Sequence, residues 1–420
     1  MEENPLHLNP NLHYSIINIL ESKSLSWIFI ADHRHPWRAT LSWITFSLLT
    51  FALPVFSHLA LQRPVYHHDH LRPFDWIVQV SLSLFSTLSF VSLWRFTRKY
   101  GLRRFLFLDK LDSLGDKVRR KYLEEVQRST MLLCAFIFPC FVCDVIYNIW
   151  WFTSGGAHIP YIYNLYLSHA IACLIHLTCW LYRTSLFLLV CVLFKLTCSL
   201  QILRLEDFAH VFEKLSDVGP ILVQHLTIKR NLRVISHRFR AFILLTLILV
   251  TTSQFASLLV TTVDGAVVNV STTGELALCS VTLVFGLYIC QRSAAKITHK
   301  AQSLTSLATK WHMCATTHNF VDMGNNDENS RDNITPRMAD LDSENEVGDG
   351  DDELDNTNFI PVYKNTISYQ QRQALVTYFE NNETGITVYG FMLDRSSINT
   401  VFAIQLSLAL WLFDKTIGFG

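Results

Sequence analysis

The sequence carries little charge for its length. Only 17% of its 420 residues are Asp, Glu, Lys or Arg, whereas soluble globular domains contain about 25%. Half of the residues are hydrophobic, and the mean hydropathy is +0.25. The apolar residues lie in runs close to the length of about 20 residues that a membrane-spanning helix needs. This pattern excludes a string of soluble domains and predicts an all-α, polytopic membrane protein.

Enzyme signatures are also missing. The sequence has no HExxH, GxSxG or Walker motif, so we expect no catalytic residues and no enzyme. Its ten cysteines lie within or just past the apolar runs, where packing is the expected role rather than disulfides. The group Cys134, Cys140 and Cys143 resembles a metal site only in spacing, so no metal and no cofactor is predicted. We expect no cleavable signal peptide and no nucleic-acid partner.

Seven apolar runs account for the hydrophobic residues. Their residues are 39–61, 76–94, 130–152, 164–194, 241–263, about 270–290 and 396–413. The fourth run is longer than a bilayer requires. We expect its helix to leave the membrane near Arg183 and to continue against other protein, although tilting could also absorb the excess length. The last run is barely long enough to span, and Pro54 is expected to kink the first.

Basic residues gather on alternate connections. Residues 95–128 hold 11 Lys and Arg, and residues 195–240 hold eight, whereas the connections after spans one, three and five hold two, none and none. The positive-inside rule therefore predicts a cytosolic N-terminus, seven transmembrane helices and an extracellular C-terminus. G-protein-coupled receptors have the opposite orientation, so the helix count does not indicate G-protein coupling.

This topology predicts five regions. Residues 1–38 form a cytosolic segment with an interfacial helix, and 39–314 a six-span bundle whose extended helices build a cytosolic anchor. Residues 315–359 form a disordered acidic cytosolic loop, within which 321–357 hold 13 acids and two bases. Residues 360–395 form a cytosolic helical segment, and 396–420 the seventh transmembrane helix with a short extracellular tail.

Several connecting strings are specific enough to indicate a family. They are RKYGLRRFLFLDKL at 98–111, ISHRFR at 235–240, KITHKAQ at 296–302, RQALVTYFENN at 372–382 and GITVYGFMLDR at 385–395. These strings resemble the plant family of gustatory receptor-like membrane proteins. That family is in turn distantly similar to insect gustatory and odorant receptors, which are seven-helix channels with a cytosolic N-terminus.

The resemblance implies an architecture. It implies a homotetramer, a cytosolic anchor, a pocket for a small-molecule ligand in the outer half of the bundle, and a pore lined by the last helix. We expect the protein to lie in the plasma membrane. The last helix departs from the insect pattern, because residues 405–413 match it only at Phe413. The predicted function is a ligand-gated or chemosensory-type channel subunit. The alternative is a non-conducting receptor or scaffold that signals through its cytosolic loops.

Polar residues within the spans supply the candidates for a ligand pocket. Asp144 lies in the outer half of the third span, and His169, Cys173 and His176 share one helical face in the fourth. A charge inside a bilayer is costly and is a default functional hypothesis. Asp144 could bind a cation or form a structural hydrogen bond, and the face of His169 could line a pocket or hold a metal. No carboxylate partner for the histidines is evident in the sequence.

The last run contains the candidates for a pore lining. Asn399 and Thr400 are expected near its cytosolic end, and Gln405 at mid-membrane. Leu408 and Leu412 share the helical face of Gln405, so this stripe predicts a polar lining with a hydrophobic constriction. Ordinary packing within the bundle is the competing interpretation.

Overall fold

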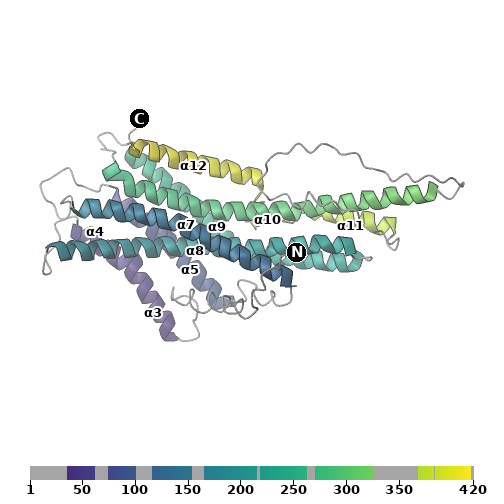
Figure 1. The fold of residues 1–420 in the computed structure, drawn as a ribbon, viewed down its shortest axis with the longest axis horizontal. Helices are drawn as coiled ribbons and strands as arrows, with labels where there is room; N and C mark the ends of the chain where they lie inside the picture. The colour runs from purple at the N-terminus through teal and green to yellow at the C-terminus, as the bar shows by residue number, and fades with distance from the viewer. Residues whose placement is uncertain are drawn as a thin grey trace, which may run out of the picture. The chain divides into compact units, whose positions relative to one another are not determined.

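The computed structural model describes residues 36–61, 74–100, 116–153, 165–214, 218–262, 270–324, 368–382 and 384–417. Nearly all of them are helical (Figure 1). The elements are α3 (Pro36–Ser47), η2 (Leu48–Ala52), α4 (Leu53–Leu61), α5 (Asp75–Tyr100), α7 (Asp116–Thr153), α8 (Leu165–Lys214), α9 (Val218–Thr261), α10 (Val270–Gly324), α11 (Tyr369–Asn381), β1 (Thr387–Val388), β2 (Phe391–Met392) and α12 (Arg395–Ile417).

The described chain divides into two units. Unit 1 comprises Met1–Thr197, Arg238–Ser293 and Ser396–Gly420, and unit 2 comprises Cys198–His237 and Ala294–Arg395. Helices α8, α9 and α10 each contribute to both units. The predicted interfacial helix before residue 36 and the acidic residues from 325 to 359 lie outside the described residues. Helix α10 continues to Gly324, ten residues into the segment expected to be disordered.

Among the residues that the structure describes, six helices are long and apolar enough to cross a membrane. They correspond to the first six predicted runs, whereas the apolar stretch of α12, Ile398–Leu412, is shorter. Burial separates these helices into two kinds. In the most apolar windows of α8 and α10, 78% and 72% of the residues are buried, against 17% in α7 and 28% in α9. Helices α8 and α10 therefore form the core, while α7 and α9 present apolar side chains outward.

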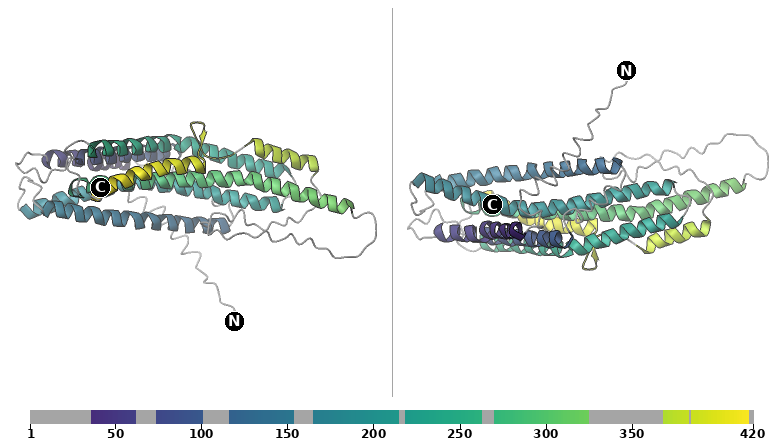
Figure 2. Two further views of the ribbon diagram at one scale, coloured as in Figure 1. Left: turned by 90° about the horizontal axis from the view of Figure 1, so that it is seen from above. Right: turned by 90° about the horizontal axis from the view of Figure 1, so that it is seen from below.

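Contacts between side chains give the directions of the helices in unit 1. Later residues of α5 meet earlier residues of α9, since Ser81 Oγ lies 2.9 Å from Ser253 Oγ and the rings of Phe96 and Phe239 are 5.2 Å apart. These two helices are therefore antiparallel. Helices α8 and α10 run parallel, because His176 pairs with Glu275 and Cys191 with Cys290. Helix α12 lies along α10, where the rings of Tyr288 and Phe402 are 4.5 Å apart (Figure 2).

Pro54 produces a change of helix type rather than a simple kink. A proline has no N–H, so the carbonyl four residues earlier, on Thr50, loses its helical partner. The chain forms the π-helical turn η2 immediately before this point. Ser83 Oγ on α5 donates to the Thr50 carbonyl at 2.9 Å and satisfies it. The side chain of Thr50 is itself fully buried, with its Oγ1 3.4 Å from Ser86 Oγ.

Unit 2 contains a short amphipathic helix and a hairpin. Helix α11 begins at a capping box formed by Ser368 and Gln371, which satisfies the free amides of its first turn. The hairpin pairs Thr387 with Met392 and Val388 with Phe391. Tyr389 and Gly390 at its tip have φ of 49° and 93°, the left-handed values that a two-residue hairpin turn requires.

Two hydroxyls hold the segment that enters this hairpin. Thr298 Oγ1 on α10 accepts from the Ile386 amide at 3.2 Å, and Ser236 Oγ on α9 accepts from the Thr387 amide at 3.1 Å. A side chain on Gly385 would meet Thr298 Cγ2 at 2.8 Å. The hairpin segment is therefore fitted closely against α9 and α10 within unit 2.

Candidate functional site

The framework of the site is the parallel contact between α8 and α10. Paired residues are 99 positions apart in the sequence: His176 with Glu275, Phe187 with Gly286 and Cys191 with Cys290. A Cβ at position 286 would overlap the ring of Phe187, so only glycine allows the helices to approach this closely. Within unit 1 this close approach fixes the levels of the polar side chains on the two helices relative to one another.

A buried pair of polar residues lies near the start of α10. His176 Nε2 is 3.1 Å from Glu275 Oε1, and the two side chains are 9% and 5% exposed. Reasoning from the sequence identified His176 but found no carboxylate for it. The structure supplies that carboxylate from a helix 99 residues away. A buried carboxylate that contacts an imidazole is a polar group able to hydrogen-bond a ligand.

Asp144 lies on the neighbouring helix α7 and is fully buried. Its main-chain carbonyl accepts from Asn148 Nδ2 at 2.9 Å. The rings of Phe136 and Phe285 stack at 3.6 Å, and the side chain of Cys140 bonds Thr282, so α7 runs antiparallel to α10. This register places Asp144 level with Leu278, about one helical turn from Glu275.

The remaining predicted pocket residues contact the end of α7. The His169 ring is 5.9 Å from that of Phe152, and Cys173 packs against the cluster of Trp151 and Phe152 at the end of α7. The face that His169, Cys173 and His176 were expected to share is thus divided between two neighbouring helices. Among the described residues, no three His, Cys, Asp or Glu side chains come together as metal ligands.

Arg183 is a further functional candidate. We expected the fourth helix to leave the membrane near Arg183, and this stays a prediction; what the sequence did not show is that its side chain is only 1% exposed. Its Nε donates to the Cys179 carbonyl at 3.2 Å, and its Nη1 lies 3.5 Å from the Gln79 carbonyl on α5. A burial pattern is not visible in one sequence, because an isolated arginine in an apolar run has the same signature at a boundary and in a core.

The last helix places its predicted pore residues on two faces. Gln405 is 3% exposed, and its Nε2 donates to Thr251 Oγ1 at 2.8 Å. Its main-chain carbonyl accepts from Gln254 Nε2 at 3.1 Å. Leu412 is buried and Leu408 is half-buried. Asn399 and Thr400 are exposed. In the single chain Gln405 therefore packs on α9, while the polar residues near the start of α12 are accessible.

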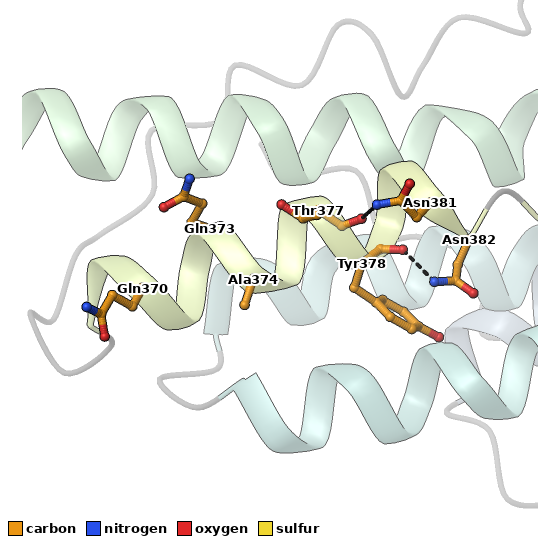
Figure 3. A pocket seen from close by; sticks show the side chains of 7 residues that line it. All are labelled: Gln370, Gln373, Ala374, Thr377, Tyr378, Asn381 and Asn382. Atoms are coloured by element: carbon orange, nitrogen blue, oxygen red, sulfur yellow. Dashed lines mark hydrogen bonds between the residues drawn. The ribbon is translucent and has the colours of Figure 1, made fainter.

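The surface of α11 forms a shallow, uncharged pocket in unit 2 (Figure 3). Its lining consists mainly of amides and hydroxyls, from Gln370, Gln373, Ala374, Thr377, Tyr378, Asn381 and Asn382. Two of the amides already donate to main-chain carbonyls of α11, Asn381 to Thr377 and Asn382 to Tyr378, each at 2.9 Å. This surface is open and carries no group suited to catalysis.

Beneath α11 lies a buried histidine, His225 of α9. Its ring centroid is 4.6 Å from that of Phe379, 5.6 Å from Tyr378 and 6.3 Å from Phe208. Burial, with a smaller contribution from the nearby Lys229 ammonium, lowers the pKa of His225 to about 4. The histidine is therefore neutral at physiological pH and acts as part of the core that holds α11.

Comparison with known proteins gives a family and a fold. The family model described as "Protein of unknown function (DUF3537)" matches residues 18–404. No curated protein shows significant sequence similarity to the chain. The structure is similar to that of the olfactory receptor OR5 of the insect Machilis hrabei, with a TM-score of 0.54 and 13% identity over 96% of this chain and 98% of the receptor. The same receptor in complex with eugenol gives a TM-score of 0.49, also at 13% identity.

These findings bear on the predicted class of protein. The likeness in fold extends over nearly the full length of both chains. Together with the six helices long and apolar enough to cross a membrane, it identifies an integral, multi-pass membrane protein. The fold is the one expected from the resemblance to insect receptors. The similarity lies in the arrangement of the helices, since only 13% of the residues are identical.

Proposed function

Because the chain belongs to the family described as "Protein of unknown function (DUF3537)" and has the fold of an insect olfactory receptor, we propose that it is a subunit of a ligand-gated, chemosensory-type ion channel. The observation that carries the proposal is the length of the fold match, 96% of this chain and 98% of the receptor. In this proposal the chain is a gustatory receptor-like protein of the plant family that its connecting strings resemble, and it is not an enzyme.

The proposed topology has seven transmembrane helices, with the N-terminus in the cytosol and the C-terminus outside. The basic connections support this orientation. Helix α12 is the seventh span, and its 23 residues reach about 35 Å, which is enough to cross a hydrocarbon core of about 30 Å. The protein is proposed to lie in the plasma membrane as a homotetramer, with unit 2 in the cytosol.

The proposed ligand pocket is the polar region between α7, α8 and α10. His176, Glu275 and Asp144 supply its hydrogen-bonding groups, and His169 and Cys173 border it toward the end of α7. The burial of His176, Glu275 and Asp144 supports this assignment, because polar groups in an apolar bundle are costly unless a partner uses them. The ligand is a small molecule that can form directional hydrogen bonds.

The proposed pore is lined by α12. Asn399 and Thr400 lie on an accessible face of this helix, and Leu408 is half-buried. Gln405 and Leu412 pack against the rest of the chain, so they reach a pore only if α12 turns about its axis on opening. The contact of Gln405 with Thr251 would then belong to the closed state.

Reconstitution into planar bilayers tests this function. We expect ion currents, and we expect Asn399→Asp and Thr400→Asp to raise the preference for cations, because a carboxylate beside a pore attracts them. Ser306→Asp, at an exposed position of α10 in unit 2, is the control and should leave selectivity unchanged. If the protein forms tetramers but no stimulus produces a current, the result would favour the alternative, a non-conducting receptor or scaffold that signals through its cytosolic loops.

A further inference from the structure

Three polar side chains are buried or half-buried in unit 2 where α8 and α10 continue beyond their apolar runs. Gln201 is fully buried, Lys300 is 5% exposed, and Arg204 is half-buried. Both amide atoms of Gln201 and two guanidinium nitrogens of Arg204, Nε and Nη2, are enclosed and have no hydrogen-bond partner among the described residues. A buried polar atom without a partner costs about 1–3 kcal/mol, so four such atoms at one place need an explanation.

The three side chains lie at the same level. Gln201 and Arg204 are three residues apart, which puts them on one face of α8. Lys300 is 99 residues beyond Gln201, and this is the separation that pairs His176 with Glu275 and Cys191 with Cys290 on the same two helices. If the same separation continues into unit 2, the parallel packing of α8 and α10 predicts that Lys300 faces Gln201.

Contacts within unit 2 give the same level independently. The rings of Phe208 and His225 pair α8 with α9, and the adjacent amides of Ile386 and Thr387 pair Thr298 of α10 with Ser236 of α9. Because α8 and α9 are antiparallel, the contact of Phe208 with His225 places Ser236 of α9 about one helical turn from Gln201 of α8. Thr298 of α10 lies at the level of Ser236, so Lys300, two residues further along α10, lies within one turn of Gln201.

The cluster has a surplus of positive charge. Arg204 and Lys300 form no ion pair with any acid in the described residues, and this includes Glu206 and Asp207, the acids closest to Arg204 in the sequence. Removing a cation from water without a counter-charge is strongly unfavourable. Lys229, level with Arg204 on α9, already donates its Nζ to Asn382 Oδ1 at 2.9 Å and brings a further positive charge rather than an acid.

The free atoms of Arg204 have the geometry that an oxyanion needs. Nε and Nη2 form one edge of the planar guanidinium, and this edge binds two oxygens of one group by parallel hydrogen bonds. We propose that Gln201, Arg204 and Lys300 form a binding site for a phosphate group. The Arg204 edge takes two phosphate oxygens, the Lys300 ammonium balances the charge, and the Gln201 amide donates to a third oxygen.

The charge of the cluster selects phosphate over a carboxylate. A carboxylate carries a single negative charge, which leaves one of the two cations, Arg204 and Lys300, without a counter-charge. A phosphate monoester has three terminal oxygens and a charge of about −1.5 to −2 at pH 7, which matches three donor groups with two positive charges. The phosphate belongs either to a soluble compound or to the head group of a lipid.

Binding to the purified full-length protein tests the site and separates these two sources. One arm titrates inorganic phosphate and pyrophosphate into protein in detergent by calorimetry, at constant ionic strength. The other arm compares thermal unfolding in nanodiscs of phosphatidylcholine with and without a phosphatidylinositol phosphate. We expect saturable binding, with one site per chain, in at least one arm. Absence of binding in both arms would mean that water alone fills the site and would overturn the proposal.

Substitutions locate the binding. Arg204→Met and Lys300→Met should each weaken binding at least tenfold, and Arg204→Lys should weaken it as well, because lysine keeps the charge but loses the two-pronged edge. Arg230→Met removes an exposed cation of α9 in the same unit and should bind as the unchanged protein does. Equal losses in Arg230→Met and Arg204→Met would show that general surface charge attracts the anion, which contradicts the proposal.

Gln201→Leu separates a binding role from a purely structural one. It removes two unsatisfied buried atoms, so we expect the protein without phosphate to unfold at a higher temperature. The rise in unfolding temperature that phosphate produces should shrink in this variant. A variant that is more stable, yet gains as much from phosphate as the unchanged protein, would remove Gln201 from the site.

Discussion

At the scale of single residues, Ser83 compensates for a defect that Pro54 creates. The Thr50 carbonyl, which has lost its helical partner, accepts a hydrogen bond from the Ser83 hydroxyl instead. In a region of the chain that crosses a membrane, no water is at hand to replace this bond. A serine on one helix therefore makes a proline tolerable in another.

Ser83→Ala should lower the free energy of unfolding by about 1–2 kcal/mol, since it leaves a buried carbonyl without a donor. Thr87→Ala, which removes only a hydroxyl bonded to its own helix, is the matched control and should change it by less. Adding Pro54→Ala to Ser83→Ala should recover much of the loss, because alanine restores the missing N–H. Unfolding by denaturant in micelles measures all three, and a silent Ser83→Ala would contradict this account.

The close contact at Gly286 gives a second prediction at this scale. Gly286→Ala should destabilise the protein by about 2 kcal/mol, because the new Cβ overlaps the Phe187 ring. Combining it with Phe187→Leu should restore part of the stability, since the smaller side chain makes room. Thermal unfolding of the single and double variants decides the point, and equal losses in both would show that the Phe187 ring is not the obstacle.

At the scale of elements, the packing of α11 on α9 depends on a neutral histidine. In an unfolded chain His225 has a pKa of about 6.5, whereas in the folded protein burial lowers its pKa to about 4. The unfolded state therefore takes up the proton first as the pH falls. The contribution of His225 is fully present above pH 6.5 and is lost progressively between pH 6.5 and 4.

The unfolding free energy should fall by up to about 3 kcal/mol over that interval because of this residue. His225→Phe should flatten this part of the pH profile, while His299→Gln, at an exposed position of α10, should leave it unchanged. Unfolding measured at several pH values, and hydrogen exchange of α11, check the prediction. A His225→Phe profile as steep as that of the original protein would assign the pH dependence to other groups.

The sequence predicts those features of the helices that depend only on a continuous stretch of residues. Long apolar runs give the six long helices, because an apolar run of that length must be buried in protein or lipid. Glu275 could not be assigned to His176, and Arg183 could not be recognised as buried, because these depend on contacts between distant segments. The π-helical turn and the hairpin were also not foreseen, although Tyr389 and Gly390 before Phe391 are compatible with a tight turn.

In the candidate site, too, the sequence identifies the polar residues but not their partners. Asp144, His176 and Gln405 stand out because each is polar within an apolar run, and the structure buries all three. The sequence could not show which neighbour each one meets. Helical spacing put Gln405, Leu408 and Leu412 on one face, but spacing does not distinguish a face turned to a pore from a face packed on α9.

At the scale of the whole molecule, the proposed orientation has a direct test. Seven spans place the two ends of the chain on opposite sides of the membrane, and six place them on the same side. We expect an epitope tag at the C-terminus to be digested by protease added to intact cells, and a tag at the N-terminus to survive until the cells are opened. A protected C-terminal tag would remove α12 from the list of spans and with it the proposed pore.

The fit of Phe187 over Gly286 also restricts how the bundle can rearrange. Sliding α8 along α10 by even one residue would drive an aromatic ring into a side chain and would separate His176 from Glu275 at the same time. Within unit 1 these two helices must therefore move together as one rigid body. Any opening of the protein must come from the helices around them, and of these α12 has the shortest apolar stretch.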